Sequence, residues 1–159
     1  DALEEKQVAF NSPEIDKSFT FADTTIETLY IDNNSNDLND SSIVLRLKHG
    51  TNTFLFTGDA STKVEKKLLN KNIQSDVLKV GHHGSRYSTS KAFLDKVNPT
   101  YAIISVGVNN TYKHPHDEII KRLKNKNIKI YRTDESGSIV AESNGSIITF
   151  KNIKTNTNG

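Results

Sequence analysis

The segment at residues 75–90, SDVLKVGHHGSRYSTS, constrains the fold of this chain more than any other. It begins with a Val- and Leu-rich run at 77–80, which is typical of a buried strand. The run ends at Gly81 in two adjacent histidines, His82 and His83, followed by a glycine and a serine-rich stretch that favours a helix start. Ligands of open α/β sheets bind at the carboxyl ends of the strands. The segment therefore indicates a metal or catalytic site.

The elements around this segment repeat an order of strand and helix. Apolar and β-branched runs predict strands at residues 18–22, 25–31, 42–48, 52–56, 77–80, 101–106, 129–132, 138–141 and 146–150. Amphipathic spacing predicts helices at residues 61–71, 90–97 and 115–126, the last with Pro115 as its first helical residue. If the strands that precede these helices are parallel, their turns share one sheet edge. Asp59, His82 with His83, and His114 would then lie close together.

Composition limits the kinds of site that this α/β chain can form. Its 159 residues fit one domain of ordinary size, about 100–150 residues. The net charge of +2, from 21 basic and 19 acidic residues, argues against a surface that binds nucleic acid over its whole extent. The absence of cysteine excludes disulfides and thiolate ligands, so a metal must use imidazole, carboxylate or water. No apolar run approaches the roughly 18 residues of a membrane helix, and we expect a soluble domain.

The ends of the chain suggest a piece of a larger protein. It begins at Asp1 and contains no methionine, from which we expect that an upstream portion is missing. We predict a connector at residues 1–17, the body of the domain at 18–150, and a frayed polar tail at 151–159.

Asp59 has two interpretations. It follows a strand and precedes a helix, where aspartate commonly caps the helix or stabilises a turn. Alternatively it is a metal ligand, because Gly58 allows close approach of the backbone and histidines occupy the next turn. For the His82–His83 pair, we expect that one imidazole binds metal and that the other supports it or contacts substrate; His83 is favoured as the ligand.

The residues after the histidine pair suggest substrate contacts. Gly84 and Ser85 could offer amide or hydroxyl donors to an anion at a helix start. His114 either caps a helix before Pro115 or lines the site, whereas His116 is expected to be an exposed first-turn residue, since a cation there opposes the helix dipole. The lysine-rich helix faces are expected to be solvated surfaces.

Several motifs match a known family in order and spacing. FLFTGDA at 54–60, DVLKVGHHGSRYSTS at 76–90, AIISVG with NNTYKHPH within 102–116 and YRTDESGSI at 131–139 resemble the second half of a metallo-β-lactamase-fold hydrolase. NDSSIVLRL at 39–47 resembles the strand that precedes the Gly-Asp motif in that family. The likeness covers residues 18–150 and is strongest to the hydrolase domain of ComEC-type competence DNA-uptake proteins.

The resemblance implies an αββα sandwich, of which this chain supplies mainly the C-terminal half. It implies two divalent ions, zinc or manganese, with Asp59 bridging them and one of His82 and His83 completing the shell of the second ion. We assign Asp59 and His83 as metal ligands and His82 and His114 as catalytic side chains. Gly84, Ser85 and His114 are assigned to substrate binding. Such ions generate hydroxide and brace a phosphodiester.

The chain departs from this family by lacking the H-x-H-x-D-H motif that carries most metal ligands. No histidine precedes His49. A catalytic zinc needs three protein ligands and a water, so the chain carries half a site. We expect the isolated chain to be inactive and its partner to be the missing N-terminal portion of the same domain.

We therefore predict part of a metal-dependent phosphodiesterase or nuclease linked to DNA uptake, with single-stranded DNA or another phosphodiester as substrate. The parent is expected to be a membrane protein with this domain on the extracytoplasmic face of a bacterial membrane. A different class, a non-catalytic module that binds nucleic acid or a partner, is favoured if the upstream sequence lacks the histidine-rich motif. A serine hydrolase using Ser85 with His82 or His83 would act independently of chelators.

Overall fold

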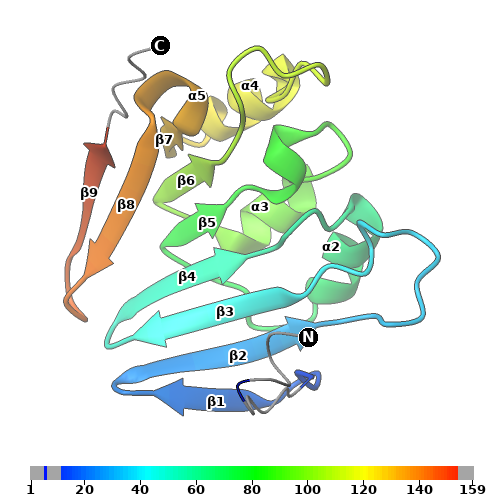
Figure 1. Cartoon of the computed structure of the whole chain (residues 1–159), viewed down its shortest axis with the longest axis vertical. Helices are drawn as coiled ribbons and strands as arrows, with labels where there is room; N and C mark the ends of the chain where they lie inside the picture. Colours follow the sequence, from blue (N-terminus) through cyan, green and yellow to red (C-terminus); the bar gives the residue numbers. More distant parts are fainter. Residues whose placement is uncertain (1–5, 7–11, 154–159) are drawn as a thin grey trace.

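The computed structural model describes residue 6 and residues 12–153, which form a large sheet and a separate hairpin (Figure 1). The large sheet has the strand order β1-β2-β3-β4-β5-β6-β7. Its strands are β1 (Ser18–Phe21), β2 (Thr24–Tyr30), β3 (Val44–His49), β4 (Asn52–Phe56), β5 (Val77–Lys79), β6 (Tyr101–Ile104) and β7 (Lys129–Arg132). The hairpin consists of β8 (Ser138–Ser143) and β9 (Ile148–Ile153).

The direction of the strands changes in the middle of the large sheet. Strands β1 to β4 pair antiparallel with their neighbours in sequence; short turns join β1 to β2 and β3 to β4, and a long loop at residues 31–43 joins β2 to β3. Strands β4 to β7 pair parallel, with Phe54 opposite Val77 and Val77 opposite Tyr101. The prediction that the turns after β4, β5 and β6 share one edge is therefore confirmed.

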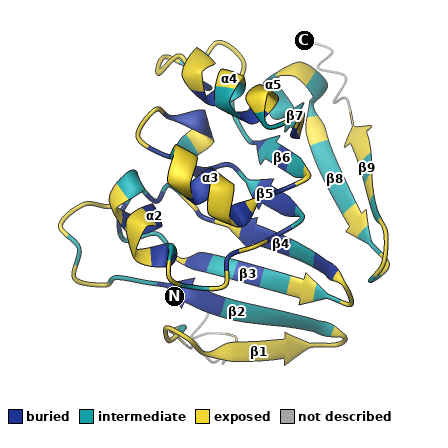
Figure 2. Ribbon diagram, turned by 180° about the vertical axis from the view of Figure 1, so that it is seen from behind, coloured by how far each residue is buried: buried dark blue, intermediate teal, exposed yellow. Residues whose placement is uncertain are grey.

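Helices connect the parallel strands on one face of the sheet (Figure 2). They are α2 (Thr62–Leu68), α3 (Lys91–Val97) and α4 (Asp117–Asn125), with the short turn η1 (Gly81–Gly84) after β5 and α5 (Thr133–Ser136) after β7. Ser61 and Ser90 are the N-caps of α2 and α3, and each side chain accepts a hydrogen bond from an amide of the first turn. The predicted start of α4 at Pro115 is wrong: His116 is the N-cap and Asp117 the first helical residue.

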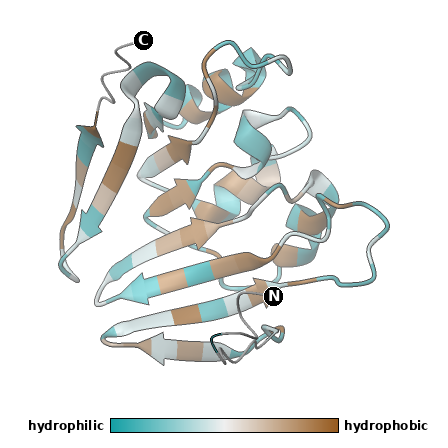
Figure 3. Cartoon of the chain, in the orientation of Figure 1, coloured by the Kyte–Doolittle hydropathy of each residue, from teal (hydrophilic) through white to brown (hydrophobic). Residues whose placement is uncertain are grey.

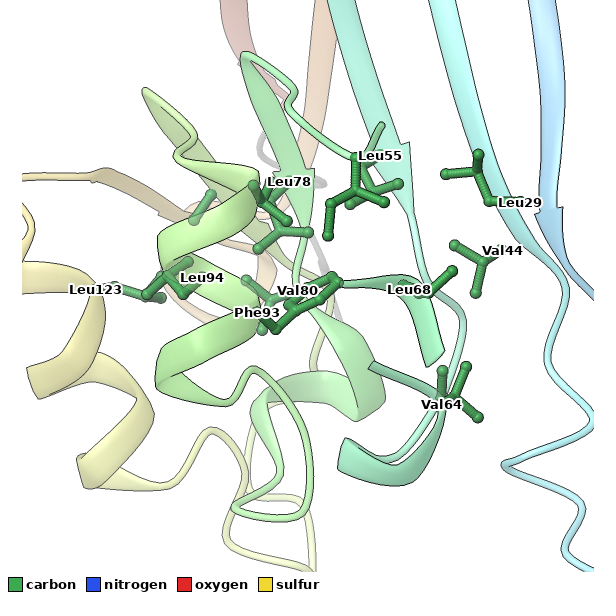
Figure 4. Packing of buried hydrophobic residues seen from close by; sticks show 14 of the residues in the cluster. Leu29, Val44, Leu55, Val64, Leu68, Leu78, Val80, Phe93, Leu94 and Leu123 are labelled. Carbon is green, nitrogen blue, oxygen red and sulfur yellow. The ribbon is translucent and has the colours of Figure 1, made fainter. Parts of the chain in front are cut away.

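The hydrophobic core lies between the sheet and these helices (Figure 4). Alternate residues of the strands, such as Leu55 and Leu78, point toward the helices and are fully buried. They meet Leu68 of α2, Leu94 of α3 and Leu123 of α4 in one cluster. The core holds the three strand-to-helix turns in a fixed arrangement.

The opposite face of the sheet is only partly covered. Phe150 of β9 stacks on Tyr131, with ring centroids 4.3 Å apart, and contacts Tyr101 in a tilted arrangement at 4.7 Å. Next to this contact a groove lies between the sheet and β8. Hydrophobic residues, coloured brown in Figure 3, are prominent along β5, β6 and β8. The apolar lining of this groove includes Leu47, Phe54, Phe56, Val77, Ile103, Ile139 and Ala141.

The mixed α/β architecture agrees with the predicted metallo-β-lactamase-like class. Strand β9 continues to Ile153, three residues into the predicted tail, and most of the predicted connector lies outside the described residues. The proposed domain bounds therefore stay predictions. Within the part of the chain that the structure describes, no helix is both long and apolar enough to cross a membrane.

Candidate metal centre

Three turns at the carboxyl edge of the parallel strands form the candidate site. The turn after β4 carries Asp59, η1 carries His82 and His83, and the loop after β6 carries His114. Backbone hydrogen bonds join these turns: the amide of His82 donates to the carbonyl of Gly58 at 3.0 Å, and the amide of His116 donates to that of Gly84 at 3.0 Å. The turns are thus linked directly as well as through the core.

The backbone of the histidine pair is left-handed. His82 has φ 48° and His83 has φ 54°. Such conformations cost non-glycine residues about 1–3 kcal/mol each and persist where the surroundings impose them. Gly84 continues the turn with φ 84°, and a Cβ there would lie 2.5 Å from the Cβ of Pro115. Glycine at this position therefore permits close contact between η1 and the loop after β6.

Asp59 and His83 are arranged as two ligands of one ion would be. The Nδ1 of His83 lies 2.7 Å from the carbonyl oxygen of Ser105, which can only accept, so Nδ1 donates; in a neutral ring with this hydrogen bond, Nε2 carries the lone pair. That Nε2 lies 3.7 Å from Oδ1 of Asp59. Two atoms each about 2.1 Å from a tetrahedral zinc lie roughly 3.4 Å apart. The pair is therefore suited to bind a shared cation with a small adjustment.

A cluster of aromatic rings borders the Asp59–His83 pair. The ring of His82 lies 5.7 Å from that of His114, which lies 4.9 Å from His116 and 5.8 Å from Tyr112. Burial lowers the pKa of His114, and the neighbouring histidines lower it further. The buried Nδ1 of His82 has no hydrogen-bond partner in the described part of the chain. The cluster thus favours a neutral imidazole at His114, beside the candidate metal ligands.

The structure modifies the expected surroundings of Ser85 and His116. Ser85 is buried, its amide donates to the carbonyl of His82 at 2.8 Å, and its Oγ accepts from the amide of Tyr87 at 3.3 Å. A backbone amide, not a histidine, therefore contacts this hydroxyl, and the roles of Gly84 and Ser85 in substrate binding stay predictions. His116 is half-buried rather than exposed, and the amide of Arg86 donates to its Nδ1 at 3.2 Å.

Sequence reasoning missed two charged residues near the site. Glu65 of α2 is buried, and its carboxylate accepts hydrogen bonds from the amides of Thr89 and Ser90; burial raises its pKa. Lys79 of β5 donates to the carbonyl of Val80 at 3.2 Å, and burial lowers its pKa although the charge of Asp59 opposes this. The sequence did offer an indication for Lys79, because a charged residue stands there within the apolar run at 77–80. Glu65 lies on a lysine-rich helix and gave no such signal.

The described residues provide only part of a metal site. Among them, no three His, Cys, Asp or Glu side chains are grouped closely enough to hold a metal ion. Asp59 and His83 supply two candidate ligands, whereas a catalytic zinc takes three from the protein. A carboxylate and an imidazole are suitable ligands for a divalent ion, but two ligands do not complete its coordination.

Comparison with known proteins matches residues 36–108 to the metallo-beta-lactamase superfamily. The chain is 41% identical over 114 residues to ComE operon protein 3 of Bacillus subtilis (strain 168), covering 70% of this chain and 15% of that protein. It is 45% identical over 106 residues to Competence protein ComA of Neisseria gonorrhoeae, covering 65% of this chain and 15% of that protein. Recombination protein 2 of Haemophilus influenzae is 41% identical to the chain over 101 residues, covering 64% of this chain and 13% of that protein. The chain thus spans at most 15% of the length of these relatives.

Proposed function

Because this chain is related to the ComEC-type competence proteins of the metallo-beta-lactamase superfamily, we propose that it is part of a metal-dependent phosphodiesterase that cleaves single-stranded DNA. The observation that carries the proposal is the placement of Asp59 and His83. Their facing atoms lie 3.7 Å apart, and the hydrogen bond to Ser105 fixes His83 in the tautomer that can bind metal. Two divalent ions bound there would supply a hydroxide and stabilise charge on a scissile phosphate.

The other residues of the edge have supporting roles in this proposal. His114, whose pKa is lowered, stays neutral near pH 7 and is suited to donate or accept a hydrogen bond at a phosphate oxygen. His82 packs between His83 and His114, with ring centroids 6.5 Å and 5.7 Å away, and limits their movement.

The remaining ligands come, in this proposal, from a segment that precedes Asp1 in the intact protein. The open face of the large sheet supports this. Sheets with parallel strands are normally covered on both faces, yet Phe56 of β4 is 41% exposed on the face opposite the helices. A second layer of the same domain would cover Phe56 and bring further ligands to the adjacent edge.

The proposal is tested by metal binding and by activity in two forms of the protein. Isothermal titration with Zn²⁺ or Mn²⁺ should show weak binding by the 159-residue chain and tight binding by a form extended upstream. The extended form should cleave fluorescent single-stranded DNA with either metal. Asp59→Ala should reduce cleavage about 100-fold or more, because loss of even a residue that supports a ligand costs 10–100-fold.

The matched control is Asp95→Ala, which removes a half-exposed carboxylate from α3 and breaks only its surface ion pair with Lys126. It should leave metal binding and cleavage unchanged. An extended form that is inactive with every divalent metal, or that is indifferent to Asp59→Ala, would refute the proposal.

The second candidate is a non-catalytic module that binds nucleic acid or a partner. It is favoured by the absence of a three-ligand group from the described residues. The two candidates separate in the extended form, because a non-catalytic module would not cleave DNA when a divalent metal is supplied.

A further inference from the structure

Two exposed tyrosines lie on the chain segments that lead away from the candidate metal centre. The side chain of Tyr112 is on the loop between β6 and α4 and that of Tyr87 is on the segment between η1 and α3; the residues are 76% and 69% exposed. Tyr112 stacks on His114 with an angle of 23° between the rings, and His114 in turn contacts His82. Tyr112 therefore extends the ring cluster of the site into solvent.

Local hydrogen bonds fix the backbone that carries each tyrosine. Asn110 closes the loop around Tyr112: its side chain accepts from the amide of His114 at 2.9 Å and donates to the carbonyl of the same residue at 2.7 Å. The carbonyl of Tyr87 accepts from the amide of Thr62 at 2.9 Å. The two aromatic rings are thus held outside the core on ordered loops, which reduces the entropy lost when a ligand binds.

A basic residue adjoins each tyrosine. Arg86 precedes Tyr87, Lys113 follows Tyr112, and both are exposed. The amide of Arg86 binds Nδ1 of His116, whose ring contacts His114, so the two loops meet through the histidine cluster. Exposed aromatic faces beside positive charges are the features by which proteins hold single-stranded nucleic acids: the rings stack on bases and the cations contact phosphates.

We propose that Tyr112 and Tyr87 stack on unpaired nucleobases of single-stranded DNA, while Arg86 and Lys113 contact its phosphates. This inference rests on the proposed function, since it names how the substrate strand is held beside Asp59 and His83. Stacking needs bases that are free of a duplex, so the arrangement selects single strands over double-stranded DNA. It is tolerant of base sequence, because every base has a face on which a tyrosine can stack.

The test measures binding without metal, in the 159-residue chain and in the presence of EDTA. Fluorescence anisotropy compares labelled oligothymidylate with an abasic strand of the same length and charge. Tyr112→Leu should weaken binding of oligothymidylate about tenfold, the effect of losing one stacked base, and should leave binding of the abasic strand unchanged. Tyr112→Phe should bind as the unmodified chain does, and Tyr87→Leu should repeat the effect of Tyr112→Leu.

The matched control is Phe21→Leu, which removes an equally exposed aromatic ring, 76%, from the edge strand β1. It should leave binding of both strands unchanged. Equal binding of oligothymidylate and abasic strand by the unmodified chain, or equal losses for both in Tyr112→Leu, would overturn the stacking site. Hydrolysis of bis(p-nitrophenyl) phosphate, which has no nucleobase, by the extended form tests the proposed reaction separately. Failure there with base-dependent binding intact refutes only the reaction.

Discussion

At the scale of single residues, the buried carboxylate of Glu65 joins the site to the helix layer. Its two oxygens accept from the amides of Thr89 and Ser90, the residues that lead from η1 into α3. Arg122 of α4 donates to the carbonyl of Thr89, so three helices meet at this point. Glu65 therefore positions the segment that carries Tyr87 and the end of η1.

Glu65→Gln should lower the free energy of unfolding by about 1–3 kcal/mol, because an amide has one acceptor oxygen and leaves a buried N–H unpaired. The effect should depend on pH. Burial raises the pKa of Glu65, so the folded chain binds its proton more tightly than the unfolded chain does. The contribution of Glu65 to stability therefore falls as pH rises from the ordinary value of 4.5 through the raised pKa. Urea denaturation across this pH range should show that this fall in stability with rising pH is absent from Glu65→Gln.

Glu118→Gln in the exposed first turn of α4 is the control for this change. It should shift the unfolding free energy by less than about 0.5 kcal/mol. Equal stability of Glu65→Gln and the unmodified chain at every pH would show that the buried carboxylate is not needed to hold this segment.

At the scale of elements, the β8–β9 hairpin is attached to the large sheet through close backbone contact at Gly50. The amide of Thr51 donates to the carbonyl of Gly145 at 2.7 Å, and a Cβ on Gly50 would collide with that same carbonyl. His49 strengthens the attachment by bridging Asp23 at 2.9 Å and Ser143 at 3.0 Å. The turn between β3 and β4 thus fixes the far end of the hairpin.

Gly50→Ala should destabilise the chain by about 2 kcal/mol and loosen the hairpin. Gly50 has φ +57°, a conformation that costs an alanine about 1–2 kcal/mol, and the added methyl group pushes the turn away from Gly145. Hydrogen exchange should show faster exchange at Thr51 and along β8. Gly107→Ala is the control, since a Cβ there meets nothing within 4 Å. Similar exchange in both variants would contradict the role assigned to this contact.

Regular elements could be predicted from sequence because alternation and capping residues determine them locally. Runs such as 77–80 and the serines before α2 and α3 placed strands and helices within a few residues of their observed bounds. The meeting of Asp59 with the histidine turns followed from parallel strand order. The left-handed histidine pair could not be predicted, because contacts with Gly58 and Pro115 impose it from other turns. The burial and hydrogen bonds of Glu65 could not be predicted for the same reason: its amide partners are 24 and 25 residues away.

At the scale of the whole molecule, the two faces of the sheet differ in how completely they are covered. One face is packed by α2, α3 and α4, as Figure 2 shows, and its strand residues such as Leu55 are fully buried. On the other face, residues 12–153 provide only the β8–β9 hairpin beside an apolar groove, with Phe56 partly exposed. This asymmetry is what a chain forming one half of a sandwich would show.

Phe56→Ser distinguishes an exposed face from one that a second layer covers. In the 159-residue chain it should lower the unfolding free energy by about 1–2 kcal/mol, because Phe56 is already 41% exposed and loses only part of the burial of a core phenylalanine. In the form extended upstream it should cost about 3–5 kcal/mol, the usual cost of truncating a buried phenylalanine. Leu55→Ala, on the helix face of the same strand, should cost about 2–5 kcal/mol in both forms.

The test depends on the difference between the two forms in the unfolding free energy lost to Phe56→Ser. Any intrinsic effect of serine on strand β4 is the same in both forms and cancels in this difference. A large additional cost in the extended form would mean that upstream residues pack on Phe56, on the face where Lys79 also lies. That layer would then end near Asp59 and His83, where further metal ligands are needed. Equal costs in both forms would leave the groove as a free surface and would remove the structural support for a metal site completed from upstream.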